Sequence, residues 1–213
     1  MSPEDALELA DWRRRVAELY GRVRAARDPV AAWRNWRGTR DALFRDHAQS
    51  PLDPVARHAF DGLPVFPYAP TLRLRVDLAP SRDEAERAVP AGSDGEVVMR
   101  PAARTLGLAE RLGGELTLYW LGGYGGGLFL PFRDATSGRQ TYGGGRYLLD
   151  GVKGADLGTE EGRLVLDFNF AYHPSCCHSP AWICPLAPAE NRLPVAVQAG
   201  ERLTAEPRTA GRP

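Results

Sequence analysis

Hydrophobic residues follow two different periods along this chain, a helical one near the amino terminus and a strand-like one further on. Up to Val23 the apolar side chains recur at helical spacing, and most other positions are polar or charged. Ser2-Pro3 and Asp28-Pro29 each combine a capping side chain with a proline for the first turn, which predicts two helix starts. The second helix is expected to end at Ser50-Pro51. We therefore interpret residues 1–60 as a helical segment.

The pattern changes to alternation after residue 70. Leu72, Leu74, Val76 and Leu78 are separated by polar residues, which is typical of a strand with one buried face. Further apolar runs predict more strands, and the polar stretch at 80–95 predicts a loop. The expected strands are residues 96–100, 104–108, 115–121, 128–132, 164–170 and 193–198.

No helix-length pattern separates these strands, so parallel strand–helix–strand units are not expected. The sequence predicts an α+β fold, mainly β, in which the N-terminal helices pack on an antiparallel sheet that closes as a barrel or roll. We assign the antiparallel β-domain to residues 61–203 and a frayed tail to residues 204–213.

The stretch Leu128–Tyr147 predicts a hairpin that is interrupted on its return strand. Pro131 lies within the first apolar run, which favours an edge or bulged position. Turn-forming residues follow at 134–138, and a return strand is expected from Gln140. Three consecutive glycines, Gly143–Gly145, interrupt that strand before it resumes.

Charge and composition narrow the class of partner. The chain has 27 basic and 27 acidic residues, so nothing in its bulk charge suggests nucleic acid or an anionic membrane as a partner. It has no apolar run long enough for a transmembrane helix and no secretory signal, so the cytoplasm is the expected compartment. The three cysteines should be reduced there.

Two arginines near the hairpin form the first candidate site. Arg133 and Arg146 could bind a carboxylate or phosphate bidentately, with Asp134 orienting one of them. The neighbouring glycines would let a ligand approach the backbone. The alternative is an arginine–aspartate pair that only fixes the turn.

A second candidate set follows in the strand at 164–170. Asp167 and Asn169 would share one face of that strand, and Tyr172 comes shortly after, so the three could line a pocket at a barrel mouth. Asp167 could act as a general base if it is buried. The alternative is a polar outer face.

Two long motifs carry a resemblance to a known family. The segments PFRDATSGRQTYGGGRYL and LDFNFAYHPSCCHSPAWICPLAPAENRLPVAVQAGE are similar to those of a bacterial and archaeal family of unknown function, DUF1684, and SPLDPVARHAFDGLPVFP resembles its earlier stretch. The resemblance covers most of the chain and implies no activity. The resemblance implies Tyr-Asn-Pro-x-Cys as the usual family sequence at the positions where this chain has Tyr172-His173-Pro174-Ser175-Cys176. Cys176 and Cys184 match the family's cysteine pair, and Cys177 does not.

The cysteine and histidine residues of this loop are the only metal candidates that we identify from the sequence. Cys176, His178 and Cys184 are zinc-type ligands, with His173 and Cys177 close by in sequence. Their spacing is not that of a zinc ribbon, and adjacent Cys176 and Cys177 would not both reach one ion easily. We therefore expect no metal and packed, free thiols, and the alternatives are a zinc site or a disulfide between Cys176 and Cys184.

Three functions remain open on this basis. The first is binding, with or without turnover, of a small anionic or sugar-like molecule at the open end of the β-domain. The second is a structural or interaction module, and the third is a metal-dependent enzyme that uses the cysteine and histidine loop. Because the chain contains no dinucleotide-binding fingerprint, we expect no cofactor, and we favour a hydrolase or lyase over a redox enzyme.

Overall fold

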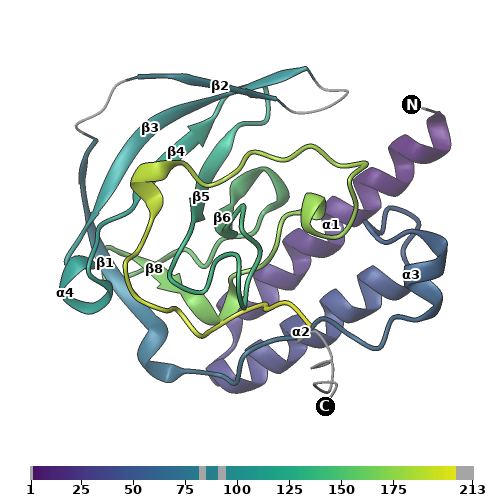
Figure 1. Cartoon of the computed structure of the whole chain (residues 1–213), viewed down its shortest axis with the longest axis horizontal. Coiled ribbons are helices and arrows are strands. Elements are labelled where there is room, and N and C mark those ends of the chain that lie inside the picture. Colours follow the sequence, from purple (N-terminus) through teal and green to yellow (C-terminus); the bar gives the residue numbers. More distant parts are fainter. Residues whose placement is uncertain (1, 82–84, 91–94, 205–213) are drawn as a thin grey trace, which may run out of the picture.

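The fold is an antiparallel sheet, curled into a half-barrel, with helices against one of its faces (Figure 1). The structure is a computed structural model of the whole chain, and it describes residues 2–81, 85–90 and 95–204. The α+β class predicted from the sequence is confirmed. The tail predicted at 204–213 lies, apart from its first residue, outside the described residues.

The helices begin where the capping signals predict. In α1 (Pro3–Ala25), Ser2 and Asp5 form a reciprocal capping box, and in α2 (Pro29–Asp46) the Asp28 side chain accepts a hydrogen bond from the Val30 N–H. The short α3 (Pro54–His58) is capped by Asp53. A further short helix, α4 (Ala109–Leu112), connects two strands. No helix of the described chain is long and apolar enough to cross a membrane.

The strands form one sheet in the order β6-β5-β4-β3-β1-β8-β7, with β2 paired to β3, and every pairing is antiparallel. The bounds are β1 Arg73–Pro80, β2 Arg87–Pro90, β3 Glu96–Leu106, β4 Thr117–Leu121, β5 Gly127–Phe132, β6 Arg146–Asp150, β7 Thr159–Glu160 and β8 Arg163–Asp167. The first half of β1 pairs with β8 and the second half with β3, so β1 joins the two parts of the sheet.

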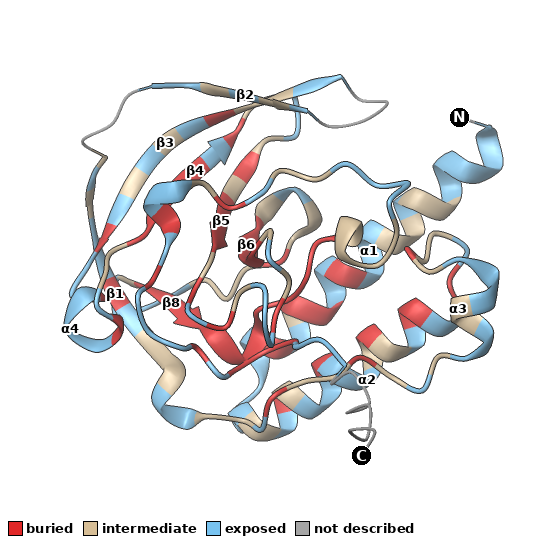
Figure 2. Ribbon diagram, viewed as in Figure 1, coloured by how far each residue is buried: buried red, intermediate tan, exposed pale blue. Residues whose placement is uncertain are grey.

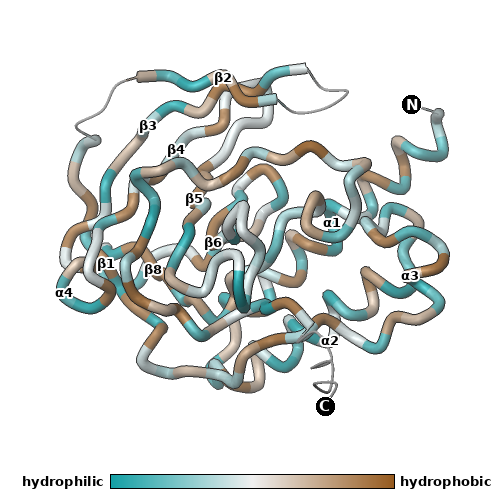
Figure 3. The backbone as a smooth tube through the Cα atoms, viewed as in Figure 1, coloured by the Kyte–Doolittle hydropathy of each residue, from teal (hydrophilic) through white to brown (hydrophobic). Residues whose placement is uncertain are grey.

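The sheet has a hydrophobic core on each of its faces, because successive strand residues point to opposite sides. The core between sheet and helices contains Leu19 and Trp36 from the helices and Tyr119 and Phe129 from the strands. The second core lies within the curl, with Leu118 and Leu130 among its residues. Figure 2 shows buried positions on the inner faces of α1 and α2 and on the central strands, and Figure 3 shows hydrophobic residues interspersed with hydrophilic ones along the same elements.

The far edges of the half-barrel are tied by backbone hydrogen bonds. Beyond β8 the chain turns through a 3-10 helix, η4 (Phe168–Phe170), and then reaches β6. There Tyr147 and Tyr172 exchange two hydrogen bonds, of 2.8 and 3.0 Å. This bridge brings the polar residues after β8 close to those of the hairpin.

Four strand predictions are wrong in detail. Residues 96–106 form the single strand β3, with an irregularity at Pro101, and the loop predicted at 80–95 contains β2. Residues 193–198 form no strand. The strand predicted at 164–170 ends at Asp167, because the Asp167 side chain accepts the Asn169 N–H and caps η4.

The predicted hairpin has no return strand before β6. Residues 133–145 instead fold as consecutive turns, which are held by hydrogen bonds to the Thr136 carbonyl. Gly145 has φ of +98°, and a Cβ there would lie 2.6 Å from the Phe132 carbonyl oxygen, so only glycine fits. The bulge predicted at Pro131 is confirmed, although β5 is an inner strand between β4 and β6.

Candidate functional site

The hairpin residues Asp134 and Arg146 form a buried ion pair. Nη2 of Arg146 donates to Oδ2 of Asp134 at 2.6 Å, and both side chains are at most 1% exposed. The guanidinium also donates to the backbone carbonyls of Val197, Ala199 and Glu201. Arg146 therefore fixes the segment 197–201 to the hairpin, and its geometry is that of a structural clamp.

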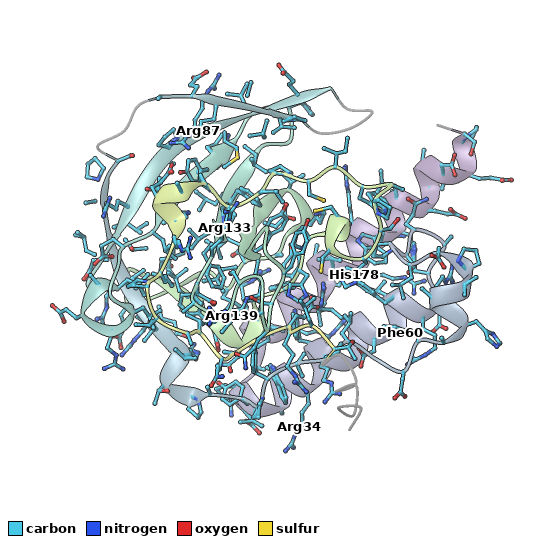
Figure 4. The ribbon with its side chains drawn as sticks, in the orientation of Figure 1. Arg34, Phe60, Arg87, Arg133, Arg139 and His178 are labelled. Carbon is cyan, nitrogen blue, oxygen red and sulfur yellow. The ribbon has the colours of Figure 1, made fainter. Side chains whose placement is uncertain are left out.

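Arg133 does not share this environment. The Arg146 guanidinium carbon lies 5.1 Å from the centroid of the Phe132 ring. Arg133 follows Phe132 in the chain, and the aliphatic part of its side chain lies beside Gly145. Arg133 is half-buried, and its Nε has no hydrogen-bond partner among the residues that the structure describes (Figure 4). The structure thus does not bring the two guanidiniums together, and the anion site predicted from both has no support in this geometry.

A second buried ion pair was not foreseen from the sequence. Nε and Nη2 of Arg40, on α2, lie 2.8 and 2.6 Å from Oε1 of Glu201. The Arg40 guanidinium also lies over the rings of Trp36, Phe44 and Tyr172, at 4.6–5.4 Å from their centroids. Burial opposes ionisation of Glu201, yet Arg40 keeps the pKa of this carboxyl below its ordinary value. The two partners are 161 residues apart, so no local pattern signals the pair.

Asn169 and Tyr172, predicted to bind a ligand, are also engaged within the protein. Asn169 is fully buried and exchanges hydrogen bonds with the backbone N–H and carbonyl of Ala69, at 2.7 and 2.9 Å. The Tyr172 hydroxyl donates to Oδ2 of Asp150 at 3.0 Å. Tyr172 belongs to the core beneath the helices, so these residues do not line a barrel mouth.

Asp167 is the predicted site residue that reaches a cavity. A pocket of about 60 Å³ lies where the end of α1 and the start of α2 meet β8. Val23, Ala32, Leu157, Val165 and Phe170 form its apolar wall. Arg24, Arg73, Glu160 and Asp167 supply its charges. This cavity lies under the helices, whereas the sequence predicts a pocket at the open end of the sheet.

The two oxygens of the Asp167 carboxyl differ in their surroundings. Oδ1 accepts the backbone N–H and the side-chain amide of Asn169, at 3.0 and 2.7 Å. Oδ2 has Nε of Arg73 as its nearest charged neighbour, at 3.8 Å, which is too long for a hydrogen bond. Burial raises the pKa of Asp167 to about 6, although the Asn169 hydrogen bonds and Arg73 oppose the shift. A carboxyl in this state can accept a proton near neutral pH.

The arginines at the rim of this pocket have exposed partners. Arg73 pairs with Glu160, and Arg24 pairs with Asp156 at 3.3 Å. The side chains of Glu160 and Asp156 are 45% and 41% exposed. Exposed pairs of this kind contribute roughly 0–1 kcal/mol, so a ligand anion could displace either carboxylate at low cost.

A larger hollow, of about 230 Å³, opens between α1 and α2 and is lined by Arg15, Glu18, Arg22 and Thr39. None of these four polar side chains is buried. A catalytic group needs a fixed position and a changed pKa, which buried polar groups provide and exposed ones rarely do. We therefore place the candidate site at Asp167.

The cysteine and histidine residues divide into two groups. Cys176 and Cys184 lie beside each other near Tyr142. Burial, and to a smaller extent the neighbouring Cys184 thiol, raises the pKa of Cys176 to about 11. His178 instead lies with His173 and Cys177. The three candidate metal ligands Cys176, His178 and Cys184 are thus not brought together, and all three cysteines are free thiols in the structure.

Comparison with known proteins places this architecture in a family. The fold and its buried polar residues define an α+β half-barrel protein with a small pocket under its helices. The family model described as "Protein of unknown function (DUF1684)" matches residues 58–202, and the chain belongs to this family. The match covers the sheet and its loops but not α1 or α2.

A solved structure resembles the chain over most of its length. It is the solution NMR structure of an uncharacterized protein from gene locus rrnAC0354 of Haloarcula marismortui. That protein is 34% identical, with a TM-score of 0.54, and the match covers 78% of this chain and 90% of the archaeal one. A search of curated proteins found no match.

The raised pKa of Asp167 predicts a pH-dependent loss of stability. Between the ordinary aspartate pKa of 3.8 and the folded-state pKa of about 6, the folded state holds the Asp167 proton more tightly than the unfolded state. Asp167 therefore makes its full contribution to the free energy of unfolding below pH 3.8. This contribution, up to about 3 kcal/mol, is lost as the pH rises through about 6. Asp167→Asn should lack this loss, as measured by urea denaturation of both proteins from pH 4 to 7.5 (roughly the titration window). If the free energies of unfolding of the two proteins changed with pH in parallel, the raised pKa of Asp167 would be contradicted.

Proposed function

We propose that the protein binds a small hydroxy acid in the Asp167 pocket, with Asp167 as general base and Arg73 as the carboxylate-binding group. The observation that carries the proposal is Oδ2 of Asp167, which accepts no hydrogen bond from the described residues, belongs to a buried side chain that lines a cavity, and lies 3.8 Å from the Arg73 Nε. A ligand hydroxyl can donate to Oδ2, while its carboxylate takes the place of Glu160 at Arg73.

The size and lining of the pocket support a ligand of this class. A single water needs about 10–15 Å³ by the same measure of volume, so the 60 Å³ of this cavity accommodates a few heavy atoms. Its apolar wall fits the carbon atoms of such a molecule, and its arginines fit an anion. The equal numbers of acidic and basic residues favour a small-molecule partner over nucleic acid. The cytosol is the compartment that we propose, and free thiols are compatible with its reducing conditions.

The chemistry proposed for this site is proton transfer. Oδ2 of Asp167 would take the proton of the ligand hydroxyl, and the pKa of about 6 lets the carboxylate accept it at neutral pH. Deprotonation of a hydroxyl group is a step of many lyase reactions. Arg73 would hold the carboxylate and so fix the distance between the hydroxyl and Asp167.

Thermal unfolding in the presence of glycerate or lactate tests the proposal. At a tenfold excess over Kd, binding should stabilise the wild type by about 1.4 kcal/mol, which raises Tm by roughly 3–6 °C over a sodium chloride control of equal ionic strength. Asp167→Asn and Arg73→Met should abolish the rise. Arg75→Met is the matched control, since Arg75 lies on the same strand, pairs with exposed Glu161 and lines no part of the pocket.

Two outcomes would contradict the proposal. One is a wild-type Tm that responds equally to glycerate, lactate and chloride, which would favour the structural-module alternative. The other is an equal loss of response in Arg75→Met and Arg73→Met, which would mean that the anions act on surface charge in general.

A further inference from the structure

Three side chains with metal-binding atoms converge in the loop after β8, away from the Asp167 pocket. One ligand atom from each of His173, Cys177 and His178 lies within 4.8 Å of the other two. A short 3-10 helix, η5 (Ser175–Cys177), brings them together. Its hydrogen bonds run from the Cys177 N–H to the Pro174 carbonyl and from the His178 N–H to the Ser175 carbonyl, both 2.9 Å.

One ring nitrogen of His178 lacks a partner. Nε2 of His178 is buried, and the described residues offer it no hydrogen bond. The His178 ring packs edge-on against Phe44 of α2, at 4.9 Å between centroids, so the helix holds the ring in place (Figure 4). A buried polar atom without a partner costs roughly 1–3 kcal/mol, and such atoms are rare unless an ion or a water binds them.

The surroundings of the three side chains favour a cation. The backbone N–H of His173 donates to Oε2 of Glu201 at 2.7 Å, and Nδ1 of the same ring lies 3.8 Å from this oxygen. Nε2 of His173 accepts the Tyr142 N–H at 3.2 Å, so its lone pair is engaged and Nδ1 is the nitrogen of this ring that is left for a metal. The Glu201 carboxylate near Nδ1 adds negative charge, which favours a cation there.

From this arrangement we infer that His173, Cys177 and His178 form a zinc-binding site. Two imidazoles and one thiolate suit zinc and related transition metals, and do not suit magnesium or calcium, which prefer oxygen. Bond lengths of about 2.0–2.3 Å place tetrahedral ligands roughly 3.5 Å apart, so the three atoms would close by about 1 Å on binding. Three protein ligands leave a fourth position for water.

Cys176 takes no part in the cluster, since its Sγ points to the Tyr142 hydroxyl at 3.8 Å and lies beside Cys184. Cys176 is therefore a matched control for its neighbour Cys177.

Metal titration of the full-length chain, produced without a histidine tag and kept reduced, tests the inference. The stripped protein should bind one equivalent of zinc in competition with a chromophoric chelator. Cobalt should give a thiolate charge-transfer band and the strong visible absorption of a tetrahedral site. Cys177→Ser and His178→Gln should weaken zinc binding at least 100-fold, about the upper limit for loss of an outer partner. Cys176→Ser should bind zinc as the wild type does.

His173→Asn is a further variant in case another fails to fold, because it removes the imidazole but keeps a polar side chain and the backbone N–H bond to Glu201. It should fold, weaken zinc binding to a similar extent and lose the tetrahedral cobalt spectrum. The inference is overturned if the folded wild type binds no zinc against the chelator. It is also overturned if Cys176→Ser loses as much affinity as Cys177→Ser.

Discussion

Replacing Arg146 by methionine should lower the free energy of unfolding by about 4 kcal/mol, which corresponds to a fall in Tm of roughly 8–16 °C. The loss follows because Oδ2 of the fully buried Asp134 loses the guanidinium that neutralises it. The carbonyls of Val197, Ala199 and Glu201 lose their donor at the same time. Chemical denaturation with a matched thermal scan measures both quantities.

Arg133→Met is the control for this prediction. Arg133 lies on the same hairpin, is half-buried, and has an Nε without a partner among the described residues. Its replacement should change stability by less than about 1 kcal/mol. If Arg146→Met were as stable as Arg133→Met, the buried pair would not be a structural clamp, and a ligand role for Arg146 would become the better interpretation.

Arg40→Met should destabilise the protein by about 3–5 kcal/mol. It leaves the carboxylate of Glu201, whose side chain is 1% exposed, without its positive partner, and it removes the cation from the rings of Trp36, Phe44 and Tyr172. The free energy of unfolding from urea titration, compared with that of Arg37→Met, is the measurement. Arg37 lies one turn earlier on α2, is 48% exposed and is 4.0 Å from Asp41, so its loss should cost less than about 1 kcal/mol.

Equal effects of the two α2 substitutions would show that Glu201 does not depend on Arg40. That result would also weaken the case that both arginine clamps act on one segment. Arg146 binds three backbone carbonyls within segment 197–201, and Arg40 binds the Glu201 side chain. This segment therefore connects the helices to the hairpin.

Local signals explain which parts of the fold the sequence predicts correctly. The helix starts at Ser2 and Asp28 are set by side chains that bond to backbone two or three residues on, so they are visible in a short window. The alternation at Leu72–Leu78 follows from one buried strand face in the same way. The sequence does not predict β2, because this strand is only four residues long, pairs with β3 alone, and contains one charge and one proline that also suit a loop.

Long-range pairing explains what the sequence could not show about the site. Asp134 and Arg146 are close in sequence, so a pair between them could be proposed as one alternative, but their burial depends on the distant segment 197–201. The Arg40–Glu201 pair gives no local signal. Asp167 was recognised as a candidate base, whereas the pocket around it is made by α1 and α2, whose position on the sheet no local pattern specifies.

The capping role of Asp167 also shows how a correct residue can be placed in the wrong geometry. An alternating strand was expected through residue 170, with Asp167 and Asn169 on one face. In the structure the Asp167 side chain caps η4 and binds Asn169 directly, which leaves only Oδ2 for a ligand. An aspartate followed two residues later by asparagine is a turn signal as well as a strand-face pair.

The most direct test of the account is where a hydroxy acid binds. Backbone amide shifts of the ¹⁵N-labelled full-length protein should be followed during titration with glycerate, against a chloride titration of equal ionic strength. If the acid binds at Asp167, the largest shifts should occur at the residues around the pocket, among them Ala26, Leu157, Val165 and Phe170. Shifts concentrated at Arg133–Arg146, or no shift beyond that in chloride, would contradict it.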